Sequence, residues 1–351
     1  MFGTYKPQDV ELLLKDITGL VEPLDTRERE KRIQSGVHYS EMLPIEYKPS
    51  PKYLAAYYDA VQRYAAMTAR AVERVAQQIW KEKGENTVLV SLARAGTPIG
   101  ILIKRYIAAK YHKDVKHYTI SIIRGLGIDA NAMRYILQRH SPADIQFVDG
   151  WIGKGAIQRE LNQAMLQYPG VNPGLAVLSD PAHIAEKYGT HDDFLIASSC
   201  LNSTVSGLLS RTFYRSDIIG ETDFHGAAFY QELLEDDVTY QFIHAVEAQF
   251  ILEEQQEDVD VSEEQVPVTV ELNGIQQEFG ITDINLIKPG IGEATRVLLR
   301  RMPWKILVKQ LDDEEHLGHL YQLAKEKGVP VVEYPLKNYR ACGLIQSMAD
   351  N

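Results

Sequence analysis

Between residues 87 and 197, short apolar runs alternate with longer segments whose apolar residues recur at helical spacing. Alternation of this kind is typical of a parallel sheet whose strands are joined by crossover helices. It predicts strands at residues 87–92, 118–123, 145–148, 175–178 and 194–197. It predicts helices at residues 98–111, 129–138 and 156–166, after a long amphipathic helix at 52–83. We therefore expect an α/β fold with a parallel sheet and flanking helices.

Each predicted strand runs into a polar or glycine-containing segment. In chain order these segments begin at Ala93, Arg124, Asp149, Ser179 and Ser198. In open parallel sheets the ligand binds beyond the carboxyl ends of the strands. An ordinary turn explains any one of these segments equally well, but together they indicate a shared site.

The third strand end has the composition of a phosphate-binding loop. Asp149 follows the apolar run, and glycines at 150, 153 and 155 lead into a segment of helical character. Glycines let main-chain N–H groups crowd onto an anion, and the following helix adds its unsatisfied donors. The P-loop pattern is absent because no Ser or Thr follows Lys154, and the dinucleotide pattern GxGxxG is absent as well.

The loop at 145–157 resembles the diphosphoribosyl-phosphate loop of the type I phosphoribosyltransferases. Asp149 falls on the first acid of that loop and Gly155 on its turn glycine. The sequence departs from the family at Gly150, where a second acid is usual, and at Ile157, where a threonine is usual. Lys154 is then expected to supply charge to the phosphate. The string SLARAGTPIG at 91–100 similarly resembles a pyrophosphate loop.

This resemblance implies a phosphoribosyltransferase-like sheet that binds a phosphorylated ribose or nucleotide ligand. Arg94 and the main chain of Ala95 and Gly96 would bind pyrophosphate with Mg²⁺, and Asp149 would hold the ribose hydroxyls. The alternative for Arg94 is a surface ion pair. The loop residues implied to hold the 5′-phosphate are Gly153, Lys154, Gly155 and Ala156. The remaining expected ligand contacts are Thr97, Arg124, Gly150, Asn202, Ser203 and Thr204.

Three longer strings, SLARAGTPIG, FVDGWIGKGAIQREL and DDFLIASSCLNSTVSGLLSRT, resemble the StiP proteins found with bacterial tellurium-resistance genes. The resemblance spans nearly the whole chain. Proteins of this family are described both as cysteine proteases and as phosphoribosyltransferases. A third possibility is a sensor that binds nucleotides without turnover.

The protease alternative requires an activated thiol, and Cys200 is the candidate. It precedes a helix expected at 204–212, whose N-terminus would lower the pKa of the thiol. The candidate bases are His183, His191 and His225. One alternative for this position is a small buried cysteine, and the polar residues at 198, 199 and 202–204 make the loop equally suited to binding a polar ligand.

The acid-rich segment at 253–265 is typical of a linker between a first domain at 1–252 and a second at 266–351. Asn273–Gly274 predicts a hairpin between strands at 266–272 and 276–279. The remaining predicted elements are a helix at 293–301, a strand at 305–309, a helix at 313–327 and a strand at 329–333.

Residues 284–345 resemble the small α/β RNA-binding domain of Pelota and the kink-turn-binding ribosomal proteins, in which a glycine-initiated helix contacts RNA. The implied contacts are Gly290, Glu293 and Arg296, with Lys288 nearby and Gly292 in place of a usual asparagine. Arginines and lysines at 300, 301, 305 and 309 make this region basic, as phosphate contacts require. The alternative is a solvated helix face.

Composition limits the remaining possibilities. A net charge of -11 and a pI near 5.4 argue against a protein that coats nucleic acid with its whole surface. The sequence contains no apolar run of membrane-spanning length and does not start like a signal peptide, so we expect a cytoplasmic protein without a membrane partner. Cys200 and Cys342 are expected to be reduced. Asp223 and His225 are possible pocket residues, but no metal ligand is assigned. A homodimer is expected from the phosphoribosyltransferase resemblance alone.

Overall fold

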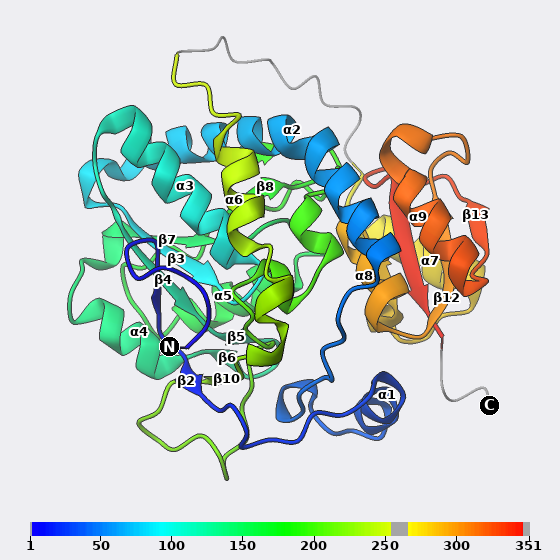
Figure 1. The fold of residues 1–351 in the computed structure, drawn as a ribbon, viewed down its shortest axis with the longest axis horizontal. Helices are drawn as coiled ribbons and strands as arrows, with labels where there is room; N and C mark the ends of the chain where they lie inside the picture. The colour runs from blue at the N-terminus through cyan, green and yellow to red at the C-terminus, as the bar shows by residue number, and fades with distance from the viewer. Residues whose placement is uncertain (1, 254–265, 347–351) are drawn as a thin grey trace.

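The computed structural model describes residues 2–253 and 266–346, so nearly all of the predicted linker lies outside the described residues. The chain forms a larger unit and, beside it, a smaller C-terminal unit (Figure 1). Each unit is built around its own main sheet.

The larger unit contains a six-stranded sheet in which every neighbouring pair is parallel. Its strands, in spatial order, are β1 (Glu11–Leu12), β4 (Lys116–Ile120), β3 (Val88–Leu92), β7 (Ile145–Val148), β8 (Leu175–Ser179) and β9 (Lys187–Thr190). The predicted α/β fold with a parallel sheet is confirmed. The predicted strand at 118–123 is divided, because β4 ends at Ile120 and β5 (Ile122–Ile123) pairs antiparallel with β6 (Gly127–Ile128).

The predicted strand at 194–197 is wrong. The sixth strand of the sheet is β9, and residues 194–197 lead instead into the 3-10 turn η4 (Ala197–Cys200). Phe194 and Ile196 are apolar because they are buried in the core between elements, not because they pair in a sheet.

Helices cover both faces of the large sheet (Figure 1). One face carries α2 (Pro51–Lys83), α3 (Gly96–Tyr111) and α6 (Thr239–Glu247), and the other carries α4 (Ala130–Leu137) and α5 (Ala156–Met165). Ser50 caps α2 by accepting the N–H of Tyr53 at 3.3 Å, and Pro51 fits the first turn because its missing N–H is not needed there.

The N-terminal arm and the segment after Cys200 add the remaining pieces of this unit. The arm contains β2 (Lys15–Asp16), which pairs with β10 (Gly226–Ala227), and α1 (Thr26–Gln34). The predicted helix at 204–212 is wrong, since only a 3-10 turn, η5 (Ser203–Val205), forms there. Gly207 and Leu208 both adopt positive φ, at 69° and 55°, which interrupts a right-handed helix.

The C-terminal unit has a four-stranded sheet with helices on both faces. Its strands, in spatial order, are β11 (Ile287–Pro289), β14 (Ala341–Ile345), β12 (Pro303–Val308) and β13 (Val331–Glu333). Helix α7 (Val268–Phe279) covers one face, and α8 (Ile291–Arg300) and α9 (Glu314–Lys327) cover the other. The predicted helices at 293–301 and 313–327 and strands at 305–309 and 329–333 are confirmed within a few residues.

The predicted hairpin at 266–279 is wrong, because these residues form the single helix α7. Leu272 and Ile275 lie three positions apart, and both belong to one buried cluster with Ile287 and Leu344 of the sheet. This packing outweighs the local turn preference of Asn273–Gly274.

The two units share one core. Ile291, Ala294 and Leu298 of α8 belong to the same buried cluster as Phe194 and Ala197 of the larger unit. Helix α8 therefore packs directly on the larger unit and fixes the walls of the space between the two. Among the described residues, no helix has the length and hydropathy of a membrane span.

Candidate functional site

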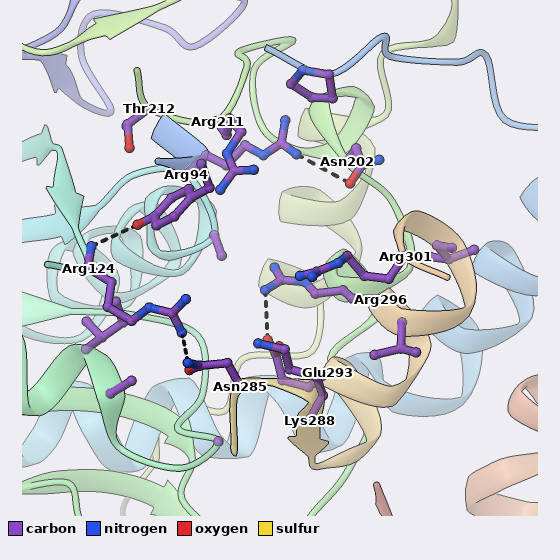
Figure 2. A pocket seen from close by; sticks show the side chains of 18 of the residues that line it. Arg94, Arg124, Asn202, Arg211, Thr212, Asn285, Lys288, Glu293, Arg296 and Arg301 are labelled. Carbon is purple, nitrogen blue, oxygen red and sulfur yellow. Dashed lines mark hydrogen bonds and ion pairs between the residues drawn. The ribbon is translucent and has the colours of Figure 1, made fainter. Parts of the chain in front are cut away.

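A cavity of about 1040 Å³ lies between the two units, at the carboxyl ends of β3 and β7. Three parts of the chain line it: the strand-end loops of the large sheet, the N-terminal arm with residues 200–212, and residues 282–301 of the C-terminal unit. Its side chains come from segments far apart in the sequence (Figure 2). Parallel strands place their carboxyl ends at one edge, which is why the loops meet here.

Fourteen of the predicted site residues line this cavity. They are Arg94, Ala95, Arg124, Asp149, Gly153, Lys154, Gly155, Ala156, Cys200, Asn202, Thr204, Lys288, Glu293 and Arg296. The predicted residues outside its lining are Gly96, Thr97, Gly150, Ser203, Gly290 and Gly292.

The loop after β3 positions Arg94. A cis peptide bond joins Ala93 to Arg94, and the Arg94 guanidinium donates to the Leu209 carbonyl at 2.8 Å and to Asn202 Oδ1 at 3.4 Å. Thr97 points into the interior, where its hydroxyl lies 2.6 Å from that of Thr119. Arg94 is thus a cavity residue and not a surface ion pair.

The loop after β7 carries the acid and the predicted phosphate residues. Asp149 Oδ1 accepts the N–H of Gly150 at 2.8 Å, and burial raises the pKa of Asp149 to about 6. Gly155 adopts φ 73° at the start of α5, a conformation that suits glycine.

Lys154 points toward the C-terminal unit. Its ammonium donates to the carbonyls of Ile284 at 2.6 Å and Ile287 at 3.3 Å. Burial, together with nearby Lys288 and Arg124, lowers the pKa of Lys154 to about 7. Arg124 in turn donates to Asn285 Oδ1 at 3.2 Å (Figure 2). These three cations, which we call the loop-side cations, form one wall of the cavity.

A second group of cations in the lining consists of four arginines close to one another, which we call the arm-side arginines. They are Arg29, Arg94, Arg211 and Arg301. Arg301 binds Glu30 through two hydrogen bonds of 2.9 and 3.0 Å. Arg211 stacks over the Tyr39 ring at 4.4 Å, and burial beside Arg29 lowers the pKa of Arg211 to about 9. An excess of buried positive charge favours an anionic ligand.

Arg29, Arg211 and Arg301 were not among the predicted ligand residues. The first lies in a charged stretch at 26–32 and the second in the string SRTFYRSD, neither of which resembles a site motif. Arg29 and Arg211 reach the cavity only through tertiary packing, so local sequence holds no signal for them, whereas Arg301 belongs to the basic region predicted at 300–309.

Cys200 lines the cavity and is 4% exposed. It ends the four-residue 3-10 turn η4, and its carbonyl accepts the hydroxyl of Tyr53. None of the described residues that line the cavity is a histidine.

The predicted histidine bases lie in other environments. His183 and His191 stack at 3.6 Å, with His191 Nδ1 2.8 Å from the Asp180 carbonyl. His225 Nδ1 lies 2.9 Å from Ser121 Oγ. Asp223 forms a 2.6 Å ion pair with Lys15, and neither Asp223 nor His225 lines the cavity.

The predicted RNA-contacting residues face the larger unit. Ile291, directly after Gly290, donates its N–H to the buried Asp193 carboxylate at 2.9 Å. A Cβ on Gly292 would lie 3.3 Å from the Trp151 ring. Arg296 stacks over that ring at 4.3 Å and binds Glu293 at 3.1 Å. This face is therefore part of the interface and of the cavity wall.

Comparison with known proteins gives matches along most of the chain. Residues 3–247 match the family described as "Tellurite-like stress resistance cysteine protease StiP", and residues 268–347 match the PELOTA RNA binding domain. A protein of Acinetobacter baylyi named "Cysteine protease StiP" is 38% identical over 369 residues, covering 99% of this chain and 94% of that protein.

Two solved structures similar to part of the chain are phosphoribosyltransferases. A hypoxanthine-guanine phosphoribosyltransferase from Bacillus anthracis is 18% identical over 35% of this chain and 75% of its own, with a TM-score of 0.27. A Helicobacter pylori xanthine-guanine-hypoxanthine phosphoribosyltransferase is 18% identical over 32% and 74%, with a TM-score of 0.25. Likeness of this extent supports no inference about activity.

Proposed function

This chain belongs to the StiP family, and we propose that the cavity between its units binds a phosphorylated ribose or nucleotide ligand. The observation that carries the proposal is the convergence of Arg94, Asp149 and Lys154 on that cavity. Loop-side cations and arm-side arginines around one cavity suit a ligand with more than one anionic group. The proposed setting is a bacterial stress or tellurium-resistance response.

The proposed reaction is phosphoribosyl transfer. The bond between ribose C1 and the pyrophosphate oxygen breaks, and pyrophosphate leaves with the electron pair. A lone pair on the acceptor forms the new bond to C1, and an acceptor that carried a proton on that atom releases it. Arg94 would stabilise the departing anion, and the Asp149 carboxylate would accept hydrogen bonds from the ribose hydroxyls and hold the ring in place. In its ammonium form, Lys154 has a third donor for the 5′-phosphate, beyond the two that bind Ile284 and Ile287.

Mg²⁺ is part of this proposal. The described residues contain no group of three or more metal-ligating side chains, so a cation would be held by the Asp149 carboxylate and mainly by phosphate oxygens of the ligand. When bound, it would supply further neutralisation of the pyrophosphate.

A thermal-shift titration with diphosphoribosyl phosphate, with and without Mg²⁺, tests the proposal. The variants are Arg94→Gln and Asp149→Asn, with Arg63→Gln as control because Arg63 lies on the exposed side of α2. Diphosphoribosyl phosphate at about a hundred times its Kd should raise the free energy of unfolding of the wild type and the control by about 2.7 kcal/mol. We expect no such stabilisation of the two cavity variants. Absence of a shift in the wild type would overturn the proposal.

A cysteine peptidase is the second candidate. Two observations favour it: the A. baylyi relative is named a cysteine protease, and Cys200 lines the same cavity. The test is cleavage of a mixed peptide library by wild type and Cys200→Ser. Cleavage that is lost in Cys200→Ser while diphosphoribosyl phosphate fails to bind would replace the first proposal with this one.

We also propose RNA binding through the outer face of the C-terminal unit. Trp304 is 36% exposed there, Lys305 lies 5.2 Å from its ring, and the exposed Lys309 follows the other end of the same strand, β12. An accessible aromatic ring beside cations suits stacking with an unpaired base. Electrophoretic shifts with single-stranded RNA should weaken in Trp304→Ala and be unchanged in Arg296→Gln; the reverse order would place RNA at the inner face.

A further inference from the structure

Two arm-side arginines, Arg29 and Arg211, have no counter-charge of their own. Neither forms a salt bridge or a side-chain hydrogen bond with any residue that the structure describes, and Arg29 Nε is buried without a partner there. Guanidinium groups without a carboxylate partner are costly to bury, and the Tyr39 ring under Arg211 carries no charge, so their presence together favours a compensating anion.

The nearby carboxylates do not supply it. Glu30 is engaged by Arg301 at 2.9 and 3.0 Å, and Glu46 accepts the N–H of Ser203 at 2.9 Å. The four arm-side arginines thus share two carboxylates that are already hydrogen-bonded. The lowered pKa of Arg211 has the same cause, because burial and the neighbouring arginines both destabilise its charged form.

An unpartnered hydroxyl lies in the lining of the same cavity. Thr204 is 2% exposed, and its Oγ1 makes no hydrogen bond within the described part of the chain. Buried hydroxyls nearly always have a partner, so this one also points to a polar ligand group.

The position of these residues assigns them a role distinct from that of the strand-end loops. Arg29 belongs to α1, and Arg211 and Thr204 belong to the segment after Cys200, so none of them is on a loop that would hold the ribose or its 5′-phosphate. Figure 2 shows Arg94 and Arg211 pointing into one space, while Arg124 and Lys288 lie across the cavity. The pyrophosphate of a phosphoribosyl donor on the loops would lie against Arg94, which leaves Arg29, Arg211 and Thr204 for the molecule that reacts with the donor.

We propose that Arg29 and Arg211, with the Thr204 hydroxyl, form a subsite for an anionic group of the acceptor. The acceptor is therefore an acid that carries a carboxylate or a phosphate, and not a neutral base. Two guanidinium groups bind either anion through paired N–H donors. The assignment of this subsite to an acceptor rests on the proposed function. The existence of an anion subsite rests only on the two arginines and the threonine.

The test is a calorimetric titration of the full chain with inorganic phosphate and with phthalate, a small aromatic dicarboxylate. Each probe is added to the protein alone and to protein saturated with diphosphoribosyl phosphate and Mg²⁺. The variants are Arg29→Gln and Arg211→Gln, with Arg63→Gln as control. Unfolding curves of the unliganded variants check that they are folded, which is expected because each substitution removes an uncompensated charge.

We expect at least one probe to bind the donor-saturated wild type and control, and to bind the two variants about tenfold more weakly, the loss of roughly one charged hydrogen bond. Diphosphoribosyl phosphate itself should bind the variants and the wild type with similar affinity. Preference for phthalate or for phosphate identifies the acid. An adventitious ion only, with equal weak binding to wild type and variants, would overturn the subsite.

Two further outcomes separate this inference from the function proposed above. Loss of donor binding in Arg29→Gln and Arg211→Gln, to the extent seen in Arg94→Gln, would assign these arginines to pyrophosphate and overturn the acceptor subsite. If the wild type binds no diphosphoribosyl phosphate, the proposed function fails, while probe binding that depends on Arg29 and Arg211 in the protein alone would still support an anion subsite.

Discussion

The Asp193 carboxylate accepts the main-chain N–H of Ile291 at 2.9 Å and so occupies the anion position at the N-terminus of α8. It also accepts the N–H of Arg340 at 2.9 Å, and burial raises the pKa of Asp193 to about 6. A helix N-terminus favours a negative charge because its first N–H groups and its dipole point at it. A residue of the larger unit thereby takes the place that a phosphate could hold on the smaller unit.

Asp193→Ala is expected to lower the free energy of unfolding by about 2–4 kcal/mol, since it leaves two buried N–H donors without an acceptor. Urea denaturation measures this loss. The exposed neighbour Asp192 provides the control, and Asp192→Ala should change stability by less than about 0.5 kcal/mol. Equal stability of the two variants would show that the contact does not hold the units together.

Asp149→Asn should stabilise the unliganded protein near neutral pH. Burial raises the pKa of Asp149 from 3.8 to about 6, so ionisation costs more in the folded protein than in the unfolded chain. The contribution of Asp149 to the free energy of unfolding of the wild type therefore falls as pH rises from about 4 to about 6, and it stays constant above that. We expect the variant to gain about 1–3 kcal/mol at pH 7 and nothing at pH 3.5. Denaturation at several pH values measures this, and a gain that does not depend on pH would contradict it.

Gly155→Ala should destabilise the phosphate-type loop. Gly155 has φ 73°, and an added Cβ would lie 2.7 Å from Ile184 Cδ1. Gly280, at the end of α7, has a similar backbone with φ 64° and open space around it, which makes Gly280→Ala a matched control. Gly280→Ala should lower the free energy of unfolding by about 1 kcal/mol because of its backbone conformation alone. Gly155→Ala should lower it by about 2–3 kcal/mol, because the clash with Ile184 adds to the backbone strain, and should also weaken ligand binding.

Cys200 should react with iodoacetamide before Cys342 in the native protein. Cys200 lines the cavity, whereas Cys342 is fully buried in β14 and burial raises the pKa of its thiol. Because Cys200 shares the cavity with the proposed ligand, saturating diphosphoribosyl phosphate should slow its alkylation several-fold while Cys342 is unaffected. Peptide mass spectrometry of timed samples gives both rates. Faster labelling of Cys342 would be incompatible with this cavity.

Much of the fold could be predicted because apolar periodicity reports burial directly. Strand β7 and helix α2 follow from it almost to the residue. The errors arose where burial has another cause: residues 194–197 are apolar because they lie under α8, and β1 is too short, at two residues, to leave a pattern. Asn273–Gly274 has a strong local turn preference that the packing of Leu272 and Ile275 overrides.

The candidate site could be predicted from the strand ends but not from the arm. Arg94, Asp149 and Lys154 follow buried strands, and sheet topology gathers them at one edge. Arg29 and Arg211 become cavity residues only when α1 and the segment after Cys200 fold over that edge. The same is true of the C-terminal unit. Its sequence predicts RNA contacts at residues 290–296, but in the structure Asp193 and Trp151 of the larger unit pack against this face.

The buried cluster that runs from Phe194 through Ala197 to Ala294 and Leu298 restricts how proteins of this architecture can diversify. Recombination transfers a segment from one gene to another most readily when the surface through which it contacts the rest of its protein is polar, because that surface can then be exposed to solvent in the new protein. A graft of residues 266–346 onto another host would carry the apolar side of α8 with it, and deletion would uncover the larger unit at the same place. Substitutions on the two sides of this cluster are therefore expected to be inherited in compensating pairs.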